Sequence, residues 1–202
     1  AKNEIDVENL KNSMLQEVAT IPPENIQEPS LKILGPALEA SKYYIEEEEL
    51  RSMFAKILAS SFDDRKNSII HPSFVEIIKQ LDVTDARILQ FLKEQNHATG
   101  SPIPCMKAVI NSDSGSKLIF PIIYFINGSE GINELSPSLT NLERLGLLKI
   151  EDDRYSANDS RYDFIRNNFI VQYMLENYPE ISLEKMCFSI TPLGKNFLKV
   201  CL

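Results

Sequence analysis

Hydrophobic residues recur at helical spacing through the first ninety positions of the chain. Two stripes follow one another between residues 46 and 92. They are Leu50, Met53, Phe54, Ile57, Leu58 and Phe62, and then Phe74, Ile77, Ile78 and Leu81. This spacing puts the apolar side chains on one face of each helix. Similar stripes predict helices at residues 5–19 and 31–45. A further helix is expected to start at residues 83–85, with Thr84 as its N-cap. We therefore expect a packed helical core.

Prolines and a long apolar run mark where this pattern stops. Three prolines between residues 21 and 29 predict an extended connector, because proline fixes φ and removes a backbone donor. Gly35-Pro36 indicates a kink or a break inside the helix predicted at residues 31–45. The apolar run from Leu118 to Ile126 fits either a buried strand or a short core helix, and periodicity does not decide between them.

The C-terminal third predicts a helix, two strands and a last helix. Ser136-Pro137 is typical of a helix start and Gly146 of a helix end. Residues 147–150 and 186–190 have the composition of strands, and Thr191-Pro192 opens the last helix. This order resembles a winged-helix domain. Residues 155–185, which include a predicted helix at 161–174, form an insertion where a short wing is expected.

These patterns together predict a mainly α protein with a small β component. We expect an N-terminal helical region, residues 1–82, packed on a C-terminal winged-helix-like region, residues 83–202. The longest apolar run spans nine residues and contains Pro121, whereas a membrane-spanning helix needs about 20. The chain is therefore expected to be cytoplasmic, without a membrane span. It starts at Ala1 rather than Met, which leaves room for an upstream segment.

Charge weighs against nucleic acid as a partner. The chain has 29 acidic and 21 basic residues, a net charge of −8, divided into −6 for residues 1–82 and −2 for residues 83–202. A phosphate backbone is repelled by such a surface unless a local basic face exists. The candidate face lies on the predicted helix at 137–145 and just beyond it. Its residues are Ser138, Thr140, Asn141, Arg144 and Arg154. These residue types serve either a protein contact or base readout.

A second candidate is a polar site formed by His71, Glu46 and Glu49. Glu46 and Glu49 belong to an acidic run that is equally well explained by the dipole of a helix start. His71 has no identifiable Ser, Cys or Asp partner, and a structural hydrogen bond explains it better than catalysis. We assign no catalytic residue, no metal ligand and no cofactor. The three cysteines, Cys105, Cys187 and Cys201, lack a CxxC pattern and are expected to be buried thiols.

Several segments in a fixed order resemble the abortive infection alpha family. They are residues 21–29 (IPPENIQEP), 35–40 (GPALEA), 50–60 (LRSMFAKILAS), 71–78 (HPSFVEII), 142–148 (LERLGLL) and 190–194 (ITPLG). The resemblance implies a bacterial protein that protects the population from phage through death or arrest of the infected cell. It supplies no catalytic residues.

Three functions follow from these observations. The leading hypothesis is a non-enzymatic phage-defence protein that acts through protein–protein contacts. The alternative is a winged-helix DNA-binding transcriptional regulator, and the third is an enzyme with a site near His71 and residues 46–49. The oligomeric state is left open.

Overall fold

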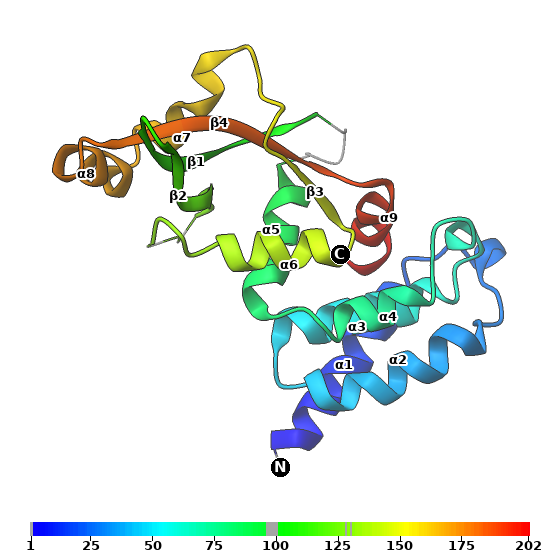
Figure 1. Cartoon of the computed structure of the whole chain (residues 1–202). Coiled ribbons are helices and arrows are strands. Elements are labelled where there is room, and N and C mark those ends of the chain that lie inside the picture. The colour runs from blue at the N-terminus through cyan, green and yellow to red at the C-terminus, as the bar shows by residue number, and fades with distance from the viewer. Residues whose placement is uncertain (1, 96–100, 128, 130) are drawn as a thin grey trace. The chain divides into compact units, whose positions relative to one another are not determined.

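The computed structural model describes residues 2–95, 101–127, 129 and 131–202, and the chain forms two compact units (Figure 1). The helical unit consists of residues Ala1–Lys93 and Pro192–Leu202. The sheet unit consists of residues Glu94–Thr191. The last helix thus belongs to the same unit as the N-terminal helices. The sequence predicted two regions that are each continuous in the chain, residues 1–82 and 83–202, and this division stays a prediction.

Helices at every predicted place build the helical unit. They are α1 (Lys2–Val18), α2 (Leu31–Tyr44), α3 (Glu48–Ser60), α4 (Ser73–Ile78), α5 (Val83–Glu94) and α9 (Pro192–Cys201), with short 3-10 turns η1 (Pro23–Asn25) and η2 (Asp64–Lys66). Helix α3 is the centre of this unit, because α1, α2, α4 and α9 all pack against it. The stripe residues within α3, from Leu50 to Leu58, are buried as the spacing predicted, whereas Phe62 lies beyond the helix and is partly buried.

Two local expectations in this unit are refined by the structure. Of the kink and the break that Gly35-Pro36 allowed, the break is not seen, because Pro36 lies inside α2, which runs unbroken from Leu31 to Tyr44. The start of α5 is capped by Asp82 rather than Thr84. The backbone N–H of Asp85 donates to the Asp82 carboxylate, and the N–H of Asp82 donates to the Asp85 carboxylate. This reciprocal arrangement satisfies two backbone donors at the helix start.

The sheet unit contains a four-stranded antiparallel sheet with the order β2-β1-β4-β3. The strands are β1 (Ile103–Ser112), β2 (Gly115–Ile123), β3 (Leu148–Glu151) and β4 (Ile181–Ile190). Strands β1 and β2 form a hairpin, and Gly115 takes the positive φ of 136° at its turn. The run from Leu118 therefore belongs to a strand and not to a core helix. Strand β4 is central, because it pairs with β1 on one side and with β3 on the other.

Helix α6 (Ser136–Arg144) packs against both β2 and β3, which are the two opposite edges of the sheet. One helix reaches both edges because the sheet curls around it into a half-barrel (Figure 1). The predicted order of helix, strands and last helix is present, and Gly146 ends α6 with a positive φ of 75°. The winged-helix arrangement itself is not seen. The two expected wing strands belong to a larger curled sheet, and the chain is not all-α.

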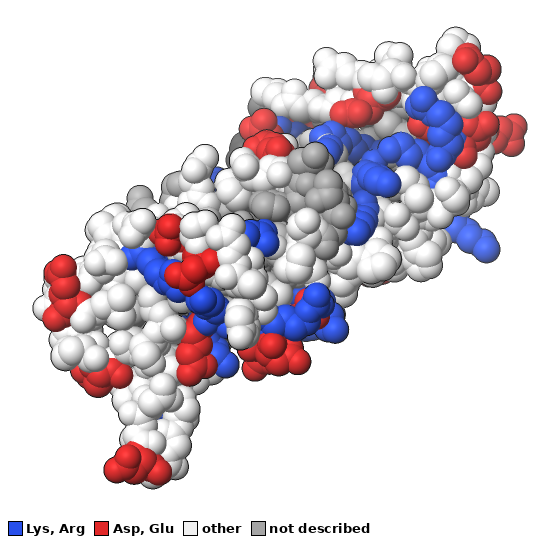
Figure 2. Space-filling model, turned by 90° about the horizontal axis from the view of Figure 1, so that it is seen from above, with Lys and Arg blue, Asp and Glu red and all other residues white. Residues whose placement is uncertain are grey.

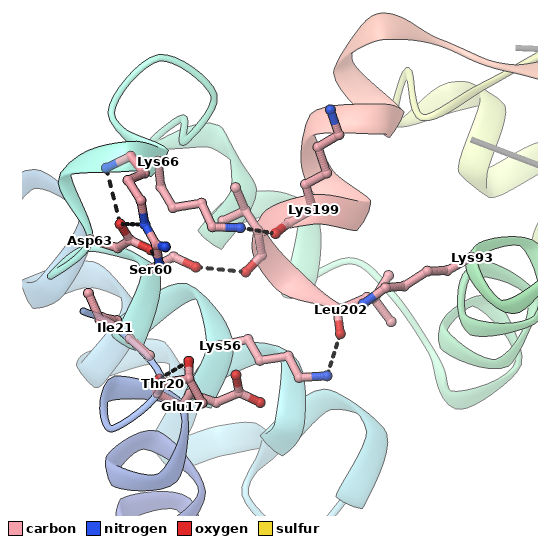
Figure 3. A pocket seen from close by; sticks show the side chains of 13 residues that line it. Glu17, Thr20, Ile21, Lys56, Ser60, Asp63, Lys66, Lys93, Lys199 and Leu202 are labelled. Atoms are coloured by element: carbon pink, nitrogen blue, oxygen red, sulfur yellow. Dashed lines mark hydrogen bonds and ion pairs between the residues drawn. The ribbon is translucent and has the colours of Figure 1, made fainter. Parts of the chain in front are cut away.

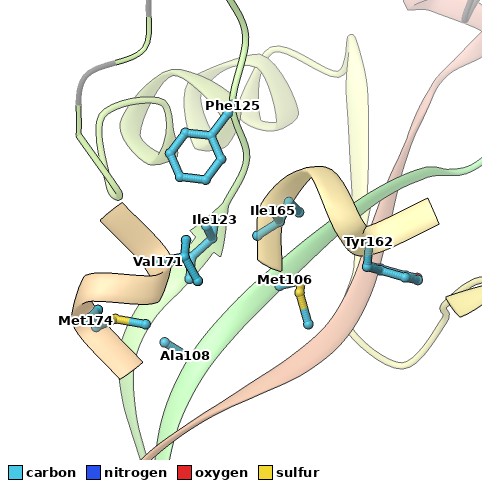
Figure 4. Packing of buried hydrophobic residues seen from close by; sticks show 8 residues of the cluster. All are labelled: Met106, Ala108, Ile123, Phe125, Tyr162, Ile165, Val171 and Met174. Carbon is cyan, nitrogen blue, oxygen red and sulfur yellow. The ribbon is translucent and has the colours of Figure 1, made fainter. Parts of the chain in front are cut away.

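Short helices from residues 159–177 cover the other part of the sheet. The predicted helix at 161–174 is instead a turn η4 (Asp159–Tyr162) followed by α7 (Asp163–Arg166) and α8 (Phe169–Asn177). The Asn168 side chain starts α8 by accepting the N–H of Ile170. These elements enclose a hydrophobic cluster with strands β1 and β2 (Figure 4). Its buried members are Met106, Ala108, Ile123, Phe125, Tyr162, Ile165, Val171 and Met174.

Candidate functional site

The predicted face of α6 is partly used inside the protein. Ser138 is only 5% exposed, and the Thr140 hydroxyl donates to the carbonyl of Ser136 at 2.9 Å. Arg144 donates to the Asn141 side-chain oxygen at 2.7 Å. These contacts hold the side chains close to their own helix. The assignment of this face to a partner stays a prediction.

Arg154, the fifth residue of that set, pairs with a carboxylate. Its guanidinium lies 2.8 Å from Glu151 Oε1, and Lys149 lies 3.7 Å from the same oxygen. The hydrogen bond from Arg154 lowers the pKa of Glu151 below its ordinary value. Arg154 is therefore engaged in an ion pair within its own part of the sheet, and it shares that carboxylate with Lys149.

His71, Glu46 and Glu49 have local structural surroundings. His71 Nδ1 accepts the backbone N–H of Ser73 at 3.1 Å and lies 2.7 Å from the Ser73 hydroxyl, at the start of α4. Glu49 pairs with Arg87 at 3.4 Å, and Glu46 is exposed before α3. Among the described residues, no hydrogen bond joins His71 to Glu49. The geometry gives His71 the position of a helix-capping residue.

A groove lies inside the curl of the sheet unit. Its volume is about 510 Å³, and residues from all four strands and from α6 line it. The lining is mixed: Lys107 and Glu184 form an ion pair of 3.4 Å across neighbouring strands, and exposed Leu118 adds an apolar wall. Thr140 from the predicted face also lines this groove.

Helix α8 of the sheet unit exposes large aromatic side chains. Phe169 is 76% exposed and Tyr173 is 66% exposed, and they lie one helical turn apart on the same face. Tyr178 just after the helix and Phe164 on α7 are exposed as well. We call Phe169 and Tyr173 the aromatic patch. Exposed aromatic side chains are enriched where proteins contact one another.

A pocket of about 280 Å³ in the helical unit is lined mainly by charged side chains (Figure 3). Lys56 of α3, Lys66 of η2 and Lys93 of α5 line it, and we call them the lysine triad. Lys66 donates to the carbonyl of Lys199 at 2.7 Å, and Lys56 donates to the carbonyl of Leu202. The last turn of α9 thus forms one wall of the pocket.

Acidic residues also line this pocket, and one of them is neutralised. Asp63 is buried and receives two hydrogen bonds from the Arg65 side chain, at 2.7 and 2.8 Å. These bonds lower the pKa of Asp63. Glu17 is the other acidic residue in the lining. The pKa of Lys93 is lowered, first by burial and then by the positive charge of Lys56.

Charged side chains of both signs are interspersed over the face drawn in Figure 2. Among the described residues there is no group of three His, Cys, Asp or Glu side chains placed to hold a metal ion. No helix in the described part of the chain is long and apolar enough to cross a membrane. All three cysteines are buried, as expected, and burial raises the pKa of the Cys105 and Cys201 thiols.

The family model described as abortive infection alpha matches residues 2–201. The chain belongs to the abortive infection alpha family. This confirms the resemblance noted in the sequence segments. No curated protein matches this abortive infection alpha protein. A solved structure of an uncharacterized protein from the marine bacterium Alcanivorax borkumensis SK2 is 16% identical, covers 68% of this chain and 94% of its own, and has a TM-score of 0.39. A TM-score this low supports no conclusion.

Neither the lysine triad nor the aromatic patch of this abortive infection alpha protein was predicted from the sequence. The lysines stand at positions 56, 66 and 93, and no local motif connects them. The aromatic patch carries a weak signal, since Phe169 and Tyr173 have the i, i+4 spacing of one helix face. That spacing was compatible with a buried face as well as an exposed one.

Proposed function

We propose that this protein acts in phage defence by abortive infection, and that it does so through contacts with other proteins. The observation that carries the proposal is the family match over residues 2–201. Abortive infection needs a protein that responds to infection and then stops or kills the host cell. The family match supports that cellular role, and the surface features below support the mode of action.

The aromatic patch supports a protein partner. Aromatic side chains supply much of the binding energy at protein interfaces when they insert into a partner's pocket. Leaving Phe169 and Tyr173 mostly in water is unfavourable for the isolated protein, because their apolar surface remains hydrated. The mixed groove near α6 lies in the same unit and offers a second contact surface.

Phage plating tests both parts of the proposal. Cells that carry the gene should form fewer plaques than cells with an empty vector, and infected cells should die or stop growing. A double variant, Phe169→Ser with Tyr173→Ser, should lose this protection. The matched control is Tyr43→Ser in the helical unit, which removes an aromatic side chain that is 78% exposed and should keep protection.

The outcomes test the defence role and the proposed contact surface separately. Equal plaque counts with and without the gene across a broad phage panel would overturn the defence role. Full protection by a folded double variant would leave the defence role intact and would refute the aromatic patch as the contact surface. Circular dichroism of each variant establishes that it is folded.

The alternative of a DNA-binding regulator has one feature in its favour, the chain order of α6, β3, β4 and α9. Against it stand the sheet unit's 13 acidic and 8 basic residues. An electrophoretic shift at low salt tests it, since phosphate contacts are strongest there. A shift that is lost in Arg144→Ala and Arg154→Ala variants would favour the regulator, and no shift on any genomic fragment would eliminate it.

A further inference from the structure

The lysine triad lacks acidic partners in a chain that has many. The chain contains 29 acidic and 21 basic residues, so cations readily find carboxylates. In the same unit, Lys11, Lys42 and Lys79 each pair with a Glu three positions earlier. Within the described part of the chain, no ion pair joins Lys56, Lys66 or Lys93 to a carboxylate.

The triad comes from three separate elements that meet at one pocket. In Figure 3, Lys66, Lys56 and Lys93 lie around the last turn of α9, and the Lys93 ammonium is directed toward Leu202. Lys199 also belongs to the lining, but its side chain is directed away from the triad. Each lysine ammonium has three N–H donors. Lys56 and Lys66 each use one on a carbonyl, which orients the group and leaves two donors for a ligand.

The pocket carries net positive charge. Asp63 is paired with Arg65. Glu17 is then the one other acidic side chain in the described lining, and it faces three ammonium groups. Burial and the charges of Lys56 and Lys66 lower the pKa of Lys93, while Glu17 acts in the opposite direction. Bringing the ammonium groups together therefore costs free energy that a bound anion would recover.

Capping of α9 explains part of this arrangement. Cationic side chains favour helix C-termini, where they hydrogen-bond the last carbonyls and interact with the helix dipole. Lys56 and Lys66 fill this role. Lys93 is directed toward the same helix end but forms no hydrogen bond with any described residue, so its ammonium keeps all three donors. Lys93 is therefore the residue that separates a ligand site from a helix cap.

We propose that the lysine triad binds a small multivalent anion of the phosphate class, such as pyrophosphate or the phosphate end of a small metabolite. The volume of about 280 Å³ is at the low end for ligand pockets. No aromatic side chain belongs to the described lining, so a nucleobase would find nothing to stack on. The pocket thus recognises phosphate groups and not a base. This site is independent of the aromatic patch and of the proposed role in defence.

Calorimetric titration and thermal unfolding of the full chain test the site. Pyrophosphate should bind and raise the melting temperature above that in sodium chloride of the same ionic strength, because a ligand of the folded state stabilises it. The Lys93→Gln variant should bind at least about tenfold more weakly, as expected from the loss of one charge-assisted hydrogen bond. Without anion, this variant should be at least as stable as the wild type, since it relieves repulsion with Lys56.

Two further variants make the test specific. Lys32→Gln removes an exposed lysine of α2 outside the pocket and should bind pyrophosphate like the wild type. Glu17→Gln removes the opposing charge and should tighten binding by about two- to fivefold. The absence of a pyrophosphate-specific stabilisation, or the same stabilisation in Lys93→Gln, would overturn the proposal.

A comparison of tripolyphosphate with a nucleoside triphosphate separates the possible sources of the anion. The two should bind with similar affinity if only phosphate groups are recognised. A gain of about tenfold or more from the nucleoside would show base recognition and would contradict the proposed ligand class.

Discussion

The two units differ in one group of cations. Both contain ion pairs, such as Lys42 with Glu39 in the helical unit, but among the described residues only the lysine triad brings several cations together at a pocket. In the sheet unit most cations are paired: Lys185 and Arg166 share Asp159, and Lys149 and Arg154 share Glu151. In the helical unit the lysine triad lines a pocket without carboxylate partners. The sheet unit instead exposes Phe169 and Tyr173. We propose above that the first surface binds an anion and that the second contacts a protein.

This contrast does not follow from overall charge. The helical unit has 13 basic and 16 acidic residues, a net charge of −3, and the sheet unit has a net charge of −5. Both units are acidic, so the difference lies in where the charges are placed. A net charge describes long-range repulsion, whereas a ligand responds to the few groups within a Debye length of its site.

The largest expected effects concern the two cores and test whether the contrast is confined to the surfaces. Phe74 in the helical unit packs edge-to-face on Phe197 at 5.3 Å, and Phe188 in the sheet unit packs in the same way on Tyr124 at 5.1 Å. Both phenylalanines are fully buried. Phe74→Ala and Phe188→Ala should each lower the free energy of unfolding by about 3–5 kcal/mol, through lost burial and the cavity left behind.

Urea denaturation measures these two losses. The exposed Leu31→Ala variant is the control and should change stability by less than about 0.5 kcal/mol. If one phenylalanine variant lost much less stability than the other, by more than about 2 kcal/mol, the cores would differ as well as the surfaces. The contrast between the units would then need a different explanation.

A smaller loss of stability is expected when a buried hydroxyl group is removed. Its size should depend on whether the hydroxyl joins distant segments or only neighbouring residues. The Tyr162 hydroxyl accepts the N–H of Ser156 at 2.8 Å and lies 3.4 Å from the carbonyl of Met186, so it joins separate segments of the sheet unit. Tyr162→Phe should lower the free energy of unfolding by about 1–2 kcal/mol, because the Ser156 N–H and the Met186 carbonyl lose their hydrogen-bond partner. The helical unit offers Ser61, whose hydroxyl donates to Leu58 three residues earlier.

Ser61→Ala should cost less than Tyr162→Phe, since the Leu58 carbonyl still accepts the backbone N–H of Ser61. Chemical denaturation of both variants gives the comparison. An equal or larger loss for Ser61→Ala would contradict the view that long-range polar contacts matter more in the sheet unit.

Local patterns predicted the helical unit well, because every helix there has its own 3.6-residue stripe or capping signal. The sheet was predicted less well. Strand β1 is buried on most positions of both faces, so it lacks the alternation that identifies a half-exposed strand. Strand β4 pairs with β3, which precedes it by 36 residues at Glu151↔Cys187, and also with β1, which precedes it by 85 residues at Ile103↔Phe188. Non-local pairing leaves no mark on a local pattern, and this is why a winged helix was expected.

The candidate sites show the same limit. The α6 residues were chosen because their types suit base or protein contacts, but residue type does not reveal that Ser138 is buried or that Arg144 contacts Asn141. The lysine triad depends on three elements meeting in space. Its residues are separated by 10 and 27 positions in the chain, and each on its own looks like an ordinary surface lysine. Only the tertiary fold reveals their shared pocket.

The smallest expected effect tests whether charge pairing stabilises the sheet unit. Asp159 accepts hydrogen bonds from Arg166 at 2.7 Å and contacts Lys185 at 2.5 Å. The bonds from Arg166, and then those from Lys185, lower the pKa of Asp159 well below its ordinary value near 3.8. A carboxylate with a lowered folded-state pKa stabilises the protein above its unfolded-state pKa, and this stabilisation disappears as the pH falls through the folded-state pKa.

Asp159→Asn should therefore be less stable than the wild type at neutral pH, and the difference should shrink as the pH drops below about 4. Because Asp159 is exposed, the loss should be small and should shrink further in high salt. Unfolding curves measured from neutral to acidic pH test this, with Asp113→Asn, an exposed residue of the β1–β2 turn, as the matched control. A loss that did not change with pH would mean that Asp159 acts through hydrogen-bond geometry and not through its charge. The ion pairs of Asp159 would then add no electrostatic stabilisation to the sheet unit. The difference between the two units would in that case depend only on whether the lysine triad binds an anion.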